Sequence, residues 1–127
     1  MGLPGDRMDK LRAVYDDSMA GLDVMRGAGV KLGFGTDLLA GFYPQQTREF
    51  TLRREVFSPL ELLRQATSVG AEILMQEGSL GCVQPDALAD LIVVDGDPLK
   101  DVGLLAAEGQ HLDLIMRGGD LVKNRLG

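Results

Sequence analysis

Residues 29–37, Gly-Val-Lys-Leu-Gly-Phe-Gly-Thr-Asp, constrain the fold of this chain more than any other segment. Residues 30–34 are apolar or small apart from Lys31, which predicts a short strand that is covered on both faces. A glycine, a threonine and Asp37 follow this strand directly. In α/β enzymes, catalytic groups lie just past the carboxyl ends of parallel strands. The segment therefore indicates an α/β fold, with Asp37 as the first candidate catalytic residue.

Three segments have the periodicity and end signals of helices. Apolar residues at helical spacing predict a helix over residues 6–28, and a shorter helix is expected over residues 47–56. The third helix has the clearest start, because Ser58 precedes a proline and stands three residues before Glu61, as in a capping box. We expect this third helix to end at Gly78.

After these helices the pattern changes to short extended segments. Strands are predicted over residues 88–94, 112–117 and 121–123, with one helical turn near residues 104–108. Gly118-Gly119 separates the last two strands and is a strong signal for a two-residue hairpin turn. The first three-quarters of the chain is thus expected to be α/β and the remainder β.

Composition limits the partners and the compartment. The 127 residues predict one domain, or one domain with a small appendage. A net charge of -6 argues against nucleic acid and anionic membrane surfaces, which both select basic proteins. No run reaches the roughly 20 apolar residues of a membrane span. Cys82 is the only cysteine, which fits a reducing compartment, and we expect a cytoplasmic protein with Cys82 buried as a small apolar residue.

Four segments resemble, in order, the C-terminal part of enzymes of the amidohydrolase superfamily. Residues 28–37 are similar to the eighth strand of the family's barrel, and residues 58–67 to the helix that follows it. Residues 89–99 resemble the return into the family's small β-sandwich, and residues 115–124 its closing hairpin. Prolidase-like and imidazolonepropionase-like enzymes are the most similar branches. One departure is Asp86, which stands where the family has a turn glycine and can adopt the same left-handed backbone.

The resemblance implies a fold class and a reaction. It implies the C-terminal fragment of a (β/α)8 TIM barrel together with part of the small β-sandwich. Residues 1–77 would form the last βα units, and residues 78–127 the sandwich portion. A complete barrel takes about 250 residues, so the chain corresponds to the final third of such an enzyme. The implied activity is metal-dependent hydrolysis of C–N bonds in amides, peptides or cyclic amides.

The resemblance also implies a cofactor, a divalent metal ion and zinc in the first place. The family's ligands are a His-x-His on the first strand, a lysine or glutamate on the fourth, and histidines on the fifth and sixth. His111 is the only histidine here, and we expect it to be a partly exposed residue at a strand edge. Catalytic zinc usually has three protein ligands and a water. We therefore expect this chain alone to bind no metal and to be inactive.

Asp37 matches the family's aspartate on strand eight, which implies that it is both a metal ligand and a catalytic residue. In the family this carboxylate takes a proton from the metal-bound water and later passes it to the leaving nitrogen. The alternative interpretation is an acid that stabilises a turn or caps a helix, and both interpretations remain open. Arg48, Glu49 and Arg53 follow the loop and would either approach a substrate or form a solvated helix face. Substrate-binding residues are otherwise not identified.

A second function class is a non-catalytic module that self-associates. A barrel fragment leaves strand edges unpaired at residues 30–34, and the strand at residues 88–94 lacks neighbours that the family's N-terminal segment supplies. Such edges pair readily with other chains. The expected partners are therefore further copies of this chain, as a homo-oligomer, or the missing N-terminal barrel portion.

Overall fold

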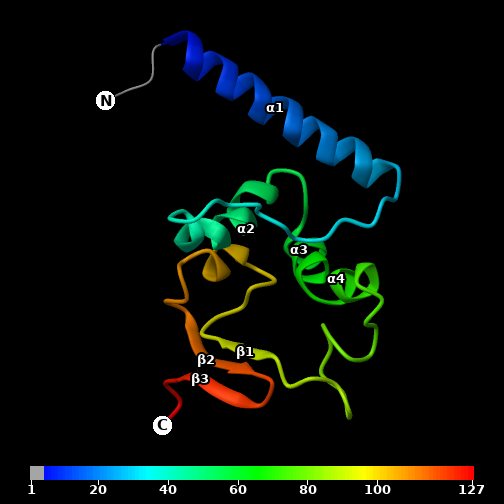
Figure 1. Ribbon diagram of the computed structural model, residues 1–127, viewed down its shortest axis with the longest axis vertical. Helices are drawn as coiled ribbons and strands as arrows, with labels where there is room; N and C mark the ends of the chain where they lie inside the picture. Colours follow the sequence, from blue (N-terminus) through cyan, green and yellow to red (C-terminus); the bar gives the residue numbers. More distant parts are fainter. Residues whose placement is uncertain (1–4) are drawn as a thin grey trace. The chain divides into compact units, whose positions relative to one another are not determined.

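The computed structural model describes residues 5–127 and divides the chain into two compact units, Met1–Val30 and Lys31–Gly127 (Figure 1). The first unit contains helix α1, Gly5–Gly27, which confirms the predicted helix within one residue at each end. Gly29 ends the helix with a positive φ of 70°, and its N–H donates to the carbonyl of Arg26. In the part of the chain that the structure describes, no helix is long and apolar enough to cross a bilayer.

The second unit begins with a segment that is not a strand. The strand predicted over residues 30–34 is wrong, because residues 30–39 have no regular secondary structure. A strand requires neighbouring backbone to complete its ladder of hydrogen bonds. The two short helices that follow are the 3-10 helix η1, Tyr43–Arg48, and helix α2, Glu49–Arg53, which replace the single helix expected over residues 47–56.

The third predicted helix is present but is broken in two. Helix α3, Pro59–Ala66, starts with the predicted capping box, in which the Ser58 hydroxyl accepts from the Glu61 N–H and the Glu61 carboxylate accepts from the Ser58 N–H. The helix stops at Thr67, whose hydroxyl donates to the carbonyl of Leu63 at 2.6 Å. Helix α4, Ser68–Ile73, then ends before the expected limit at residue 78.

The C-terminal part forms a small antiparallel sheet (Figure 1). Its order is β1-β2-β3, with the bounds Leu91–Val94, Leu112–Arg117 and Asp120–Asn124. Gly118 and Gly119 have φ angles of 57° and 91°, as the predicted hairpin turn requires. Between β1 and β2 lies the 3-10 helix η2, Val102–Leu105, near the predicted helical turn.

The core of the second unit lies where the short helices meet. Its buried apolar residues are Phe57, Leu62, Ala71, Val102 and Leu105. Leu62 of α3 is 0% exposed. α2 lies against η2, and the Thr47 hydroxyl before α2 donates to the carbonyl of Ala106 at 3.2 Å. This packing fixes α2 and α3 beside the segment that leads to Asp37.

Two single-residue expectations have different outcomes. His111 is partly exposed beside the sheet, as predicted, and its carbonyl accepts from the Asp95 N–H at 2.8 Å. Cys82 is only half-buried, so the prediction of a buried thiol is wrong. It lies in an irregular stretch beyond α4, where neighbouring side chains such as Val83 are largely exposed and no core encloses the thiol.

Candidate functional site

Asp37 lies on the irregular segment between Lys31 and η1, with its side chain exposed. Its φ of 46° places the backbone in the left-handed region, which aspartate tolerates better than most residues. Within residues 5–127, the Asp37 carboxylate makes no hydrogen bond or ion pair. The carboxylate is therefore available to a ligand, a proton or a residue of another chain.

Arg53 holds the backbone that precedes Asp37. Its Nη1 donates to the carbonyl of Gly33 at 2.9 Å and to Oε1 of Gln65 at 3.0 Å. Its Nη2 lies 2.5 Å from Oε1 of Glu49, and both of these side chains are only 12% exposed. The prediction that Arg53 would either approach a substrate or lie on a solvated helix face is thus corrected, because the side chain points into the unit and is enclosed.

Aromatic and charged contacts add to this restraint. The Arg53 guanidinium lies 4.8 Å from the ring centre of Phe34, whose ring centre is 4.6 Å from that of Phe50. At the start of the segment, Nζ of Lys31 lies 2.7 Å from Oε2 of Glu72 on α4. The hydrogen bond and the negative charge of Glu72 raise the pKa of Lys31. The segment is therefore held by side chains from α2 and α4 instead of by a strand ladder.

A hollow of about 240 Å³ lies next to the Asp37 backbone, since Thr36 and Leu38 line it although Asp37 does not. Its lining residues are Thr36, Leu38, Gln45, Arg48, Glu49 and Leu52. Nη1 of Arg48 donates to Oε1 of Gln45 at 3.1 Å, which orients an otherwise exposed guanidinium. The negative charge of Glu49 is compensated by Arg53, so the charge of Arg48 makes this hollow positive. An arginine in this state suits a carboxylate, which it can bind through two parallel hydrogen bonds.

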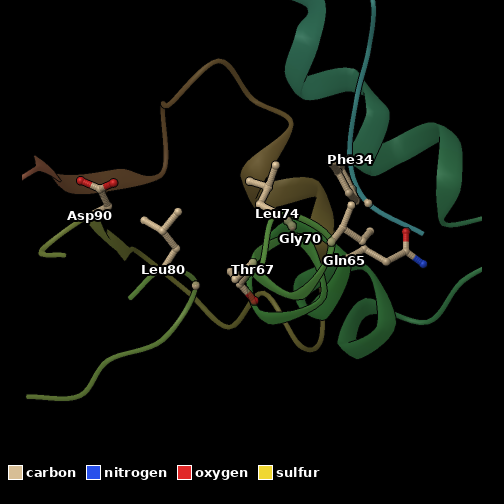
Figure 2. Close-up of a pocket in the computed structure, with 12 residues that line it drawn as sticks. Phe34, Gln65, Thr67, Gly70, Leu74, Leu80 and Asp90 are labelled. Carbon is tan, nitrogen blue, oxygen red and sulfur yellow. The ribbon is translucent and has the colours of Figure 1, made fainter. Parts of the chain in front are cut away.

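A larger hollow of about 440 Å³ has Phe34 in its lining. Figure 2 shows Phe34 and Gln65 at one end of it and Leu80 and Asp90 at the other. Its wall is mainly apolar, and Oδ1 of Asp90 already accepts from the Gly118 N–H at 2.6 Å. Since its one carboxylate is engaged in holding the sheet, this hollow has the character of a packing surface and not of a catalytic centre.

In the part of the chain that the structure describes, possible metal ligands are not grouped into a centre. Among residues 5–127, no three histidine, cysteine, aspartate or glutamate side chains come together as ligands. Asp37 is one possible ligand, whereas a catalytic zinc takes three from the protein. The role of Asp37 as a metal ligand therefore stays a prediction, and we assign no step of a reaction to a metal.

The chain resembles known hydrolases over nearly its whole length. The model of the Amidohydrolase family matches residues 12–122. A crystal structure of an amidohydrolase is 43% identical with a TM-score of 0.87 and is matched over 99% of this chain and 30% of its own. A prolidase solved with N-methylphosphonate-L-proline is 42% identical with a TM-score of 0.84, over 97% of this chain and 30% of its own.

A more distant relative is the ochratoxinase of Aspergillus niger, which is 27% identical over 123 residues. The match covers 96% of this chain and 25% of the ochratoxinase. The crystal structure of that enzyme has a TM-score of 0.78 to this chain. The chain thus spans between a quarter and a third of the length of these relatives.

Proposed function

We propose, from the premise that this chain belongs to the amidohydrolase family, that it is the C-terminal part of a metal-dependent hydrolase of C–N bonds. Family membership and the prolidase and ochratoxinase relatives support hydrolase function. The finer assignment depends on one observation. An exposed and unpaired Asp37 lies at the end of a segment that side chains of α2 and α4 hold in place.

In this proposal Asp37 moves the proton. Its carboxylate accepts a proton from the attacking water as the new C–O bond forms, and then donates that proton to the nitrogen as the C–N bond breaks. Proton transfer of this kind requires a carboxylate within hydrogen-bond reach of the water. The chain supplies this acid, and the remaining ligands of a metal centre would come from residues outside it. We therefore propose that the chain alone is inactive.

The proposed substrate is an acylated amino acid with a free carboxylate. The prolidase was solved with N-methylphosphonate-L-proline, and an Xaa-Pro dipeptidase that is 28% identical was solved with methionine in its active site. Both ligands end in an amino-acid carboxylate. In this chain, the hollow lined by Thr36 and Leu38, the two neighbours of Asp37, offers the guanidinium of Arg48 to such a group. The scissile bond would then be the C–N bond on the amino side of that residue.

A chimera tests the role of Asp37. The matching C-terminal 30% of the prolidase would be replaced by this chain, and hydrolysis of an Xaa-Pro dipeptide would be measured with zinc present. Asp37→Asn is expected to lower kcat by about 100-fold or more, because general acid-base groups contribute roughly that much. Asp86→Asn is the matched control, since Asp86 is also exposed with a positive φ of 68°. An Asp37→Asn chimera with undiminished kcat would overturn the proposal.

Self-association is the second candidate function, and the exposed apolar surface of β1 favours it. Ile92 and Val93 are 50% and 41% exposed, and β1 is an edge strand of the sheet. Apolar edge strands form intermolecular contacts readily. In this alternative the chain acts as a homo-oligomeric module and Asp37 is a turn residue.

A further inference from the structure

We infer that Arg53 is a positioning residue for Asp37, which sets the path of residues 33–37 without itself contacting the substrate. The inference rests on the proposed function of Asp37. It also goes beyond that function, because it assigns a role to an enclosed arginine on α2 that the reaction itself does not use. Its basis is the set of contacts that converge on one guanidinium.

Arg53 joins three separate parts of the second unit. A guanidinium has five N–H donors in a fixed plane, and a flat face that stacks on aromatic rings. Here the donors reach Glu49 within α2, Gln65 on α3 and the carbonyl of Gly33 on the irregular segment. The guanidinium also lies over the ring of Phe34. One side chain therefore fixes the segment against two helices.

The enclosure of this group argues that the contacts persist in solution. Arg53 and Glu49 are each 12% exposed, and Gln65 is 7% exposed. A charge that is withdrawn from water keeps its partners, because loss of one partner leaves the other charge uncompensated. Lysine cannot replace the arginine here, since an ammonium has neither the planar fork nor the stacking face.

The restraint reaches Asp37 through the two residues that separate it from Phe34. Gly33 and Phe34 are the last residues before Asp37 with a described side-chain anchor, and no strand ladder supports the segment in residues 31–39. Asp37 itself has a φ of 46°, a conformation that persists only when its surroundings determine it. We therefore expect Asp37 to lose its fixed position when Arg53 can no longer hold Gly33 and Phe34.

Backbone dynamics of the full chain test this directly and require no catalysis. We expect Arg53→Lys to lower the ¹⁵N order parameters of residues 33–38 from about 0.85 to below about 0.6, while those of the sheet stay unchanged. Arg54→Lys, the same substitution at the exposed neighbouring arginine, is the matched control and is expected to change nothing. Unaltered order parameters at residues 33–38 in Arg53→Lys would overturn the inference.

Gln65→Met is the second variant, because it removes one acceptor of Arg53 and leaves the pair with Glu49 in place. We expect the same local loosening with a smaller amplitude. A uniform loss of order in both variants, including the sheet, would overturn the inference, because Arg53 would then support the whole unit and not Asp37 in particular.

The prolidase chimera adds a catalytic readout. Arg53→Lys is expected to lower kcat, calculated per metal-loaded enzyme, at least 10-fold and to change KM less than twofold. Arg54→Lys is expected to leave both kcat and KM unchanged. A purely structural role would reduce the amount of folded enzyme and leave kcat per loaded site intact, and that result would contradict positioning. If the chimera is inactive, the proposed function fails while the order parameters still decide the role of Arg53.

Discussion

Arg48 and Arg53 lie close together in sequence and have opposite environments. Arg53 is enclosed by Glu49, Gln65 and the ring of Phe34. Arg48 is exposed, and its one described side-chain partner is the neutral Gln45. A guanidinium that is already satisfied holds structure, whereas one with free donors can bind a ligand. In the proposed hydrolase, this difference is the basis for proposing that Arg53 positions Asp37 and that Arg48 contacts the substrate.

Substitution of Arg48 is predicted to weaken substrate binding selectively. In the prolidase chimera, Arg48→Gln should raise KM for an Xaa-Pro dipeptide by about 10-fold or more, because a hydrogen bond to a charged group contributes roughly 1.5–3 kcal/mol. The value of kcat should change little, since the contact is equal in the ground and transition states. Steady-state kinetics on the dipeptide and its C-terminal amide would measure this.

The amide substrate is the control for charge recognition. It lacks the carboxylate, so we expect Arg48→Gln to leave its KM unaltered. An equal rise of KM for both substrates would show that Arg48 does not bind the substrate carboxylate.

Sequence and structure agree at residue scale where the signal is local. The tolerance of Asp86 for a left-handed backbone could be predicted from its residue type, and its φ of 68° confirms it. Asp37 could be proposed because it follows an apolar run and two glycines. The role of Arg53 could not be predicted, since its partners Gly33 and Gln65 lie 20 and 12 residues away. Its own helix pattern resembles a solvated face, and only tertiary contacts enclose it.

Secondary-structure elements could be predicted where their cause is local in sequence, and could not where it lies in distant residues. The capping box of α3 is complete within Ser58 to Glu61, and the hairpin turn within Gly118 and Gly119, so both could be predicted. The prediction of a strand over residues 30–34 is wrong. A strand depends on neighbouring backbone for its hydrogen bonds, and local sequence signals do not show whether that backbone is present. The break at Thr67 was missed for a related reason. A Cβ on Gly81 would lie 2.5 Å from the carbonyl oxygen of Thr67, so a distant glycine permits a close approach at the break.

The capping box gives a stability prediction at this scale. Ser58→Ala removes the hydroxyl that accepts from the Glu61 N–H and is expected to lower the free energy of unfolding by about 1 kcal/mol. Urea denaturation followed by circular dichroism should show a lower midpoint with an unchanged slope. Ser58→Thr, which keeps the hydroxyl, should retain most of the stability. An Ala variant with the midpoint of the parent would mean that the box contributes nothing.

For the whole molecule, the order of the motifs carried the most information. The four segments predicted a fragment of the amidohydrolase fold, and the match to solved amidohydrolases over 30% of their length confirms a mixed helix and sheet fragment of that fold. The completeness of a site could not be predicted in the same way. Catalytic residues of a barrel come from the ends of several strands, and this chain matches only about 30% of the length of the solved amidohydrolases. The division at residues 77 and 78 also stays a prediction.

The exposed apolar surface gives the last prediction, which concerns assembly. We expect the purified chain at 50 µM to have a light-scattering mass above the 13.7 kDa of one copy, because the edge strand β1 exposes Ile92 and Val93. Ile92→Lys should shift the mass toward the monomer, since a charge on an edge strand opposes pairing. Gln110→Lys adds the same charge at an exposed polar position and should leave the mass unchanged. A parent chain that is monomeric at this concentration would exclude the self-associating module and leave the hydrolase fragment as the remaining candidate.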